Sequence, residues 1–129
     1  MSPTVTSFNH PGTASGLLVL APGEIDQLPW LPVPGCPGVE EKELWRSGDR
    51  VHALIRYAPG SRTPGRPHWV ADHHIWVLQG TATIGGRRVV AGSYLHVPPT
   101  MEHPIESLDP AGCTILQLHH RAVRKPLEN

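Results

Sequence analysis

Three histidines carry the clearest chemical signal in this chain. His68, His73 and His103 all lie within residues 59–107. A divalent metal ion needs several lone-pair donors that converge within about 2.0 to 2.2 Å of it, and neutral imidazole is one of the donors that Zn²⁺ prefers. Neighbouring strands of a small β-barrel hold such side chains on a rigid frame. The spacing therefore predicts a metal centre with these three histidines as ligands.

Side-chain alternation along a strand separates the adjacent histidines His73 and His74. If His73 points into a barrel, Ile75 and Val77 also point inward, whereas His74 faces the opposite side. A β-bulge at the start of the strand would exchange the two histidines. His120 is expected to face outward. Three further histidines stand on expected strands and are candidates for a fourth metal ligand: His52, His96 and His119.

These ligands need a scaffold, and the composition predicts an all-β one. The 15 prolines and 13 glycines interrupt the chain so often that no window longer than about ten residues keeps a helical apolar period. Short alternating runs recur between turn signals, which favours a sandwich or a barrel. The expected strands are residues 50–57, 75–78, 81–84, 87–90, 93–97 and 113–119.

The dipeptide Gly85-Gly86 is the strongest turn signal. A two-residue link of this kind supplies the positive φ angles of a type I′ or II′ hairpin turn, so residues 81–84 and 87–90 are predicted to pair. The first forty residues differ from the rest because prolines are spaced through them. We expect them to form an extended arm that lies over the barrel or over a partner subunit.

Length and charge exclude several classes of protein. A chain of 129 residues suits one domain, and at this size about two-thirds of the surface exposed by the unfolded chain can be buried. The 11 basic side chains balance 11 acidic ones, so the chain shows no electrostatic footprint for nucleic acid or anionic membrane. The apolar run at residues 17–21 is too short for a signal sequence or a membrane span. We expect a soluble cytoplasmic protein.

The histidines belong to two segments that together resemble the paired motifs of the cupin superfamily. In the first segment Gly60 opens the motif, His68 stands at its second histidine position, and Gly80 closes it. Arg66 and His73 replace a histidine and a glutamate of the motif. Because the matching ligands that remain are all neutral, a bound ion would keep its full double positive charge.

In the second segment Gly92, Pro98 and His103 match the motif, while Thr100 and Ser107 replace a glycine and an asparagine. The resemblance implies an all-β fold, a single-domain cupin, in which a double-stranded β-helix closes into a jelly-roll barrel. The implied organisation is an extended N-terminal arm at residues 1–27, the cupin barrel at 28–120 and a C-terminal tail at 121–129.

More narrowly, the chain is similar to the ChrR-type cupins, which include zinc-binding anti-sigma factors and small dioxygenases that cleave ketones. The similar runs include Arg56-Tyr57-Ala58-Pro59-Gly60, Val77-Leu78-Gln79-Gly80 and Ala91-Gly92-Ser93-Tyr94-Leu95. Cupin barrels host oxygenases, isomerases, cyclases, lyases and sensors, so the resemblance predicts the fold more sharply than the reaction.

Other side chains near the expected ligands are candidates for substrate binding and catalysis. Arg66 either marks a decayed metal site or is a catalytic residue, whose guanidinium at the cavity mouth would pair with a substrate carboxylate or enolate. Trp69 could wall an aromatic substrate. His96 could shuttle a proton as a catalytic residue. His52 and His119 are the remaining candidates for contact with the substrate.

Three functions follow, and we rank them in this order. The first is a non-redox metal enzyme that cyclises or isomerises a small enolisable carbonyl compound, because an imidazole shell around Zn²⁺ polarises a carbonyl without oxygen. The second is an Fe²⁺ dioxygenase that cleaves a ketone or diketone. The third is a metal-binding sensor or ligand-binding module. In each case apolar outer strands and the extended arm favour a homodimer.

Overall fold

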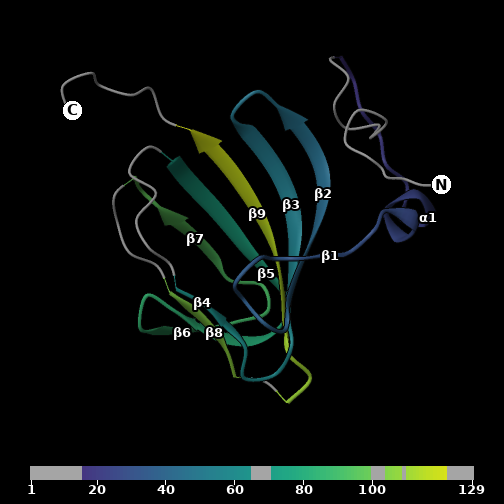
Figure 1. The fold of residues 1–129 in the computed structure, drawn as a ribbon. Coiled ribbons are helices and arrows are strands. Elements are labelled where there is room, and N and C mark those ends of the chain that lie inside the picture. Colours follow the sequence, from purple (N-terminus) through teal and green to yellow (C-terminus); the bar gives the residue numbers. More distant parts are fainter. Residues whose placement is uncertain (1–15, 65–70, 100–103, 109, 122–129) are drawn as a thin grey trace.

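The computed structural model describes residues 16–64, 71–99, 104–108 and 110–121. These residues form one short helix and a curled antiparallel sheet of nine strands, which bends like half a barrel (Figure 1). The all-β prediction is therefore confirmed. The elements are α1 Pro22–Gln27, β1 Leu31–Pro32, β2 Val39–Ser47, β3 Arg50–Tyr57, β4 Arg62–Thr63, β5 Ala71–Ile84, β6 Arg87–Val90, β7 Tyr94–Val97, β8 Ile105–Ser107 and β9 Cys113–Arg121.

The long strand β5 joins the two parts of the sheet. The strand order is β1-β2-β3-β9-β5-β8-β4, and β6 and β7 also pair with β5. The first part of β5 lies between β9 and β7, whereas residues 81–84 pair with β6. The sheet therefore curls along β5, and we call its concave side the inner face and its convex side the outer face.

The predicted strands are found, with differences in their bounds: β7 begins one residue later, β9 ends two residues later, and β5 is longer. Strand β3 has the bounds that the alternation predicted, and the Gly85-Gly86 hairpin forms with positive φ angles of 60° and 84°. The two strands predicted at residues 75–78 and 81–84 are one continuous strand, β5. The glycine that was expected to end the first of them, Gly80, lies inside β5 with a φ of 80°.

Gly80 is required by close contact between strands as well as by its backbone angle. A Cβ atom at this position would lie 1.9 Å from the carbonyl oxygen of Gly112, which directly precedes β9. Gly112 in turn has a φ of 90°, and a Cβ there would lie 2.3 Å from the carbonyl oxygen of Tyr57 on β3. Strands β5, β9 and β3 can approach this closely only because both residues lack a side chain.

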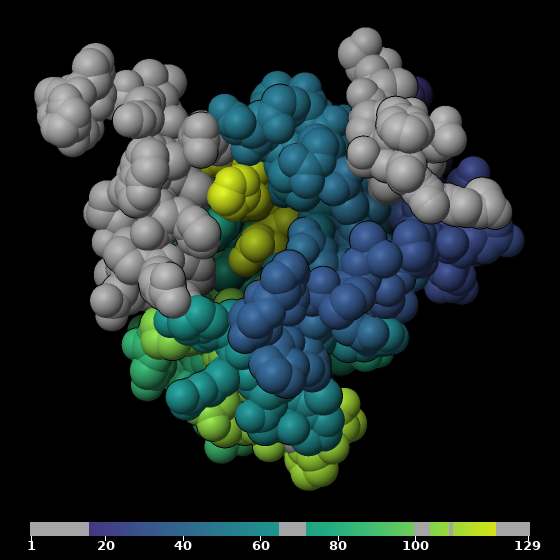
Figure 2. All heavy atoms as spheres, in the orientation of Figure 1, coloured from purple at the N-terminus to yellow at the C-terminus, as the bar shows by residue number. Residues whose placement is uncertain are grey.

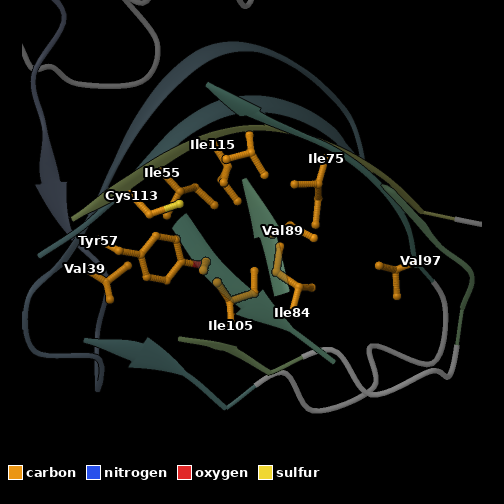
Figure 3. Close-up of a cluster of buried hydrophobic side chains, with 12 residues drawn as sticks. Val39, Ile55, Tyr57, Ile75, Ile84, Val89, Val97, Ile105, Cys113 and Ile115 are labelled. Atoms are coloured by element: carbon orange, nitrogen blue, oxygen red, sulfur yellow. The ribbon is translucent and has the colours of Figure 1, made fainter. Parts of the chain in front are cut away.

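The hydrophobic core lies on the inner face (Figure 3). Ile75 on β5 and Ile115 on β9 are 0% exposed, and burying a side chain of this size stabilises the folded state by about 1.5 to 3 kcal/mol. Both strands also continue past the core toward their histidines. The core cluster consists of Val39, Ile55, Tyr57, Ile75, Val77, Ala82, Ile84, Val89, Val97, Ile105, Cys113 and Ile115.

The described part of the predicted arm contains a helix where an extended segment was expected. Helix α1 begins at Pro22, whose fixed φ suits the first helical position, and the Glu24 carboxylate accepts a hydrogen bond from the backbone N–H of Ala21. Lys42 on the outer face of β2 donates a hydrogen bond to the carbonyl of Ile25 at 2.7 Å. No helix in the described ranges has the length and apolar character needed to span a membrane.

Candidate metal centre

His73 lies on the inner face, as the alternation along β5 predicted. It is 4% exposed, and its neighbours on the same face, Ile75 and Val77, are buried. Trp76 and Leu78 face the other side and are 42% and 46% exposed. The shift in the pairing of β5 with β9 lies beyond Val77, so no bulge exchanges the two histidines.

The sheet brings His119 of β9 directly beside His73. The two residues are register partners, and Nε2 of His73 lies 2.8 Å from Nδ1 of His119. Their ring centres are 4.8 Å apart. Figure 2 shows a recess in the molecular surface in which atoms of β9, coloured yellow, are visible. Of the histidines proposed as a fourth ligand or a substrate contact, His119 is therefore the one that joins His73.

This inner pair fits part of a metal site. Two neutral imidazoles whose ring nitrogens approach each other this closely offer lone pairs to the same small volume, and a pair of this kind suits a borderline divalent cation. Within the described ranges no group of three or more histidine, cysteine, aspartate or glutamate side chains is placed to hold a metal. A complete site needs ligands from elsewhere in the chain.

Several predicted site residues lie outside the described residues. His68, Arg66 and Trp69 fall in residues 65–70, and His103 falls in residues 100–103. The roles assigned to them, as metal ligands for the two histidines and as substrate contacts for the arginine and tryptophan, therefore stay predictions.

The inner face also carries carboxylates that the sequence reasoning missed. Glu41 and Glu43 on β2 pair with the inward residues Ile55 and Ala53 of β3, and Ala53 pairs in turn with Gln117 of β9. Burial raises the pKa of Glu41, the charge of Glu43 raises it further, and Arg46 opposes the shift. The alternation Val39, Glu41, Glu43 was the available signal, because these residues share one face of a strand.

The outer face carries a second group of histidines, which we call the outer histidine cluster. It consists of His52, His74, His96 and His120. Nε2 of His52 lies 2.9 Å from Nε2 of His120. The ring of His74 stacks on that of His96, with ring centres 4.7 Å apart, and its Nδ1 lies 2.7 Å from the hydroxyl of Tyr94.

The placement of His52 and His96 differs from the expectation that they serve the inner site. Both side chains face away from His73, because β3 and β7 present them on the outer face. His96 interacts there with the carboxylate of Asp72 at 3.0 Å. A proton shuttle or substrate contact at the inner pair would require the opposite strand parity. His120 faces outward, as expected.

The electrostatics around His52 and His120 favour the neutral form of these two imidazoles. Burial lowers the pKa of His52, and the nearby His120 and Arg50 lower it further. Burial also lowers the pKa of His120, with smaller contributions from Arg50 and His74, while Asp72 opposes them. Two neutral rings can share one N–H hydrogen bond between their facing nitrogens, which matches the short distance between them.

The chain is similar to one protein family and to several solved structures. A family model described as the ChrR cupin-like domain matches residues 21–123. The structure of KdgF from Halomonas sp. is 25% identical with a TM-score of 0.64, and the match covers 74% of this chain and 91% of that chain. No curated protein sequence matches the chain.

Two further structures share the fold. The polyketide cyclase RemF from Streptomyces resistomycificus is 20% identical with a TM-score of 0.63, and the match covers 75% of this chain and 78% of that one. The structure of Rhodobacter sphaeroides SigE in complex with the anti-sigma ChrR gives a match of 22% identity and TM-score 0.63, which covers 74% of this chain and 50% of that one. The curled antiparallel sheet and these similarities define a cupin. Because the family model spans most of the chain, the protein belongs to the ChrR cupin-like family.

Proposed function

We propose that this cupin is a metal-dependent enzyme that cyclises or isomerises a small enolisable carbonyl compound, such as an aromatic or polyketide-like ketone, without redox chemistry. The observation that carries the proposal is the inner pair, in which His73 and His119 bring two imidazole nitrogens within 2.8 Å of each other on the inner face of the sheet. Imidazole ligands and a carbonyl substrate suit Zn²⁺, with Fe²⁺ as the alternative metal.

The protein ligands would be His73 and His119, together with His68 and His103 as the motif resemblance implies. When bound, the ion would polarise the substrate carbonyl and lower the free energy of its enolate. Side chains of the protein would bind the substrate and transfer its proton. Arg66 and Trp69 keep their predicted roles in binding the substrate's negative charge and its aromatic ring.

Glu41 is the group on the inner face best suited to proton transfer. Its raised pKa brings the carboxyl closer to neutral pH, where a general acid or base is most effective. In this proposal Glu41 takes the proton from the carbon next to the carbonyl and returns it at another position. Gln117, on the same face of β9, offers a hydrogen bond to a polar group of the substrate.

The named functions of the structural relatives leave the choice of reaction open. A polyketide cyclase and a sugar phosphate isomerase from Silicibacter pomeroyi are 20% and 17% identical to this chain, which shows a shared fold only. The proposal therefore depends on the inner face of this chain. The homodimer and the cytoplasmic location expected from the sequence remain predictions.

The experiment is to measure metal content, oxygen consumption and enolisation together. The purified chain is analysed for zinc and iron and then mixed with an aryl β-diketone in D₂O, and exchange at the central carbon is followed by NMR. We expect zinc, no oxygen uptake, and exchange that Glu41→Gln slows by about 100-fold. The matched control is Glu40→Gln, because Glu40 pairs with Arg56 on the outer face.

The other outcomes would support a different function or contradict the role of Glu41. Iron with oxygen uptake would support the ketone-cleaving dioxygenase. Metal binding without exchange or oxygen uptake would support a sensor or ligand-binding module. Equal exchange rates for Glu41→Gln and Glu40→Gln would refute the role of Glu41.

A further inference from the structure

The sheet carries two histidine pairs on opposite faces. His119 and His120 are consecutive residues of β9, so their side chains point to opposite sides. His119 meets His73 on the inner face, whereas His120 meets His52 on the outer face. Since a sheet separates the pairs, one ion cannot bind both, and the outer pair needs its own explanation.

The outer pair is formed by neighbouring strands. In the register of β3 and β9, Arg50 lies opposite His120 and His52 lies opposite Leu118, so the two histidines are diagonal neighbours on one face. Their ring centres are 5.1 Å apart and their planes differ by 28°. Both nitrogens that face each other are Nε2, the atoms farthest from the backbone. When both rings carry their proton on Nδ1, the pair presents two lone-pair donors at one point of the surface.

We propose that His52 and His120 form a second metal site, which binds one divalent transition cation such as Zn²⁺ and ties β3 to β9. With the ring centres kept 5.1 Å apart and metal–nitrogen bonds of about 2.0 to 2.1 Å, the two Nε2 atoms would lie about 3.3 Å from each other. The angle between the two bonds would then be about 105°, close to tetrahedral. The separation needs to open from 2.9 Å by only about 0.4 Å.

Neighbouring side chains hold the ring of His52 in place and set the local charge at the outer pair. The indole of Trp45 packs against the ring of His52 with centres 4.6 Å apart. Arg50 opposes a bound cation, while Asp72, the register partner of His120, attracts one. Because no third side chain in the described ranges completes a three-ligand group, water would fill the other positions. Two protein ligands fit a weak site that strengthens the contact between two strands.

The test is to count the Zn²⁺ ions that the full chain binds. The chain is stripped with a chelator and titrated with Zn²⁺ alone by calorimetry, in the native form and as His52→Gln, His120→Gln, His119→Gln and His96→Gln. We expect two bound ions in the native chain and in His96→Gln, the matched outer-face control. His52→Gln and His120→Gln should each weaken one ion by at least tenfold and leave the other unchanged.

Loss of the inner site should be separate from loss of the outer site. His119→Gln should remove or weaken the ion at the inner site. Because the two sites are lost by different substitutions, failure of the proposed enzyme function does not decide the proposal for the outer site. A native affinity for the outer ion that survives in both His52→Gln and His120→Gln would overturn it. If a variant does not fold, ¹⁵N spectra of the native chain decide the question, because Zn²⁺ must shift the Nε2 resonances of His52 and His120. Unshifted resonances at saturating Zn²⁺ would also overturn it.

Discussion

Replacing Gly80 with alanine should destabilise the fold through a clash between strands. The new Cβ would lie 1.9 Å from the carbonyl oxygen of Gly112 and 2.9 Å from the Cα of Cys113, both of which are backbone atoms. Neither can move without changing the pairing of β5 with β9, which also aligns His73 with His119. The variant therefore tests whether close approach at this glycine holds the two strands together.

The loss of stability expected for Gly80→Ala has two parts, which a second variant separates. Gly92 has a φ of 93°, and a Cβ added there would have no atom within 4 Å beyond its own chain neighbours, so Gly92→Ala measures the backbone cost alone. That cost is about 1 to 2 kcal/mol for a left-handed residue. Gly80→Ala adds an overpacking cost of about 1 to 3 kcal/mol or more. The sum of about 2 to 5 kcal/mol is a large part of a typical stability of about 5 to 15 kcal/mol.

Urea unfolding of the native chain and the two variants measures both costs. We expect the midpoint of Gly80→Ala to fall well below that of Gly92→Ala, by an amount equivalent to at least about 1 kcal/mol. The effect of alanine on the unfolded chain is similar at both positions and cancels in the comparison. Equal midpoints for the two variants would refute the reasoning, because they would show that β9 does not restrict this position.

Three further predictions concern protons, metal and the helix. Burial lowers the pKa of His52 and His120 from 6.5, so these groups contribute stability above that pH, and this contribution is lost as the pH falls through their folded-state pKa values. Urea unfolding from about pH 7 to 5 should therefore show a smaller loss of stability in the variant that carries both His52→Gln and His120→Gln. An unchanged loss in that variant would contradict the prediction. Metal analysis should show that His103→Ala abolishes metal binding at the inner site while His74→Ala does not; the reverse result for these two variants would mean that the strand parity is shifted by one residue. The native chain should also release metal as the pH falls below about 6. Lys42→Met should remove the hydrogen bond to α1 and lower the free energy of local unfolding of α1 by about 1 to 3 kcal/mol. Hydrogen exchange should then be faster in α1 alone, and a uniform increase along the chain would contradict the prediction.

Much of the fold could be predicted because its signals are local. The alternation in residues 50–57 sets the faces of β3, and Gly85-Gly86 supplies two positive φ angles for the hairpin. Charged side chains concealed β2, because Glu41 and Glu43 face inward where apolar residues are expected. Pro22 ends an apolar run in the sequence, and this concealed α1, although the first position of a helix also accepts proline.

The candidate site could be predicted only in part, because its members come from strands that are distant in sequence. The parity of β5 put His73 inward and His74 outward. By contrast, nothing near His119 in the sequence shows that it would lie beside His73, which is 46 residues away. In the sequence, His52, His96 and His119 were equal candidates because each stands on an expected strand. The strand register then showed which of them lies beside His73.

The sequence by itself determined the strand character, the turn and the inward direction of His73, because these depend on the sterics of neighbouring residues. Only the tertiary structure decided that β9 lies between β3 and β5, and with it that His119 joins the inner pair while His120 joins the outer one. The physical reason is that strand order and register are fixed by closure of the whole sheet over its core, to which every strand contributes at once.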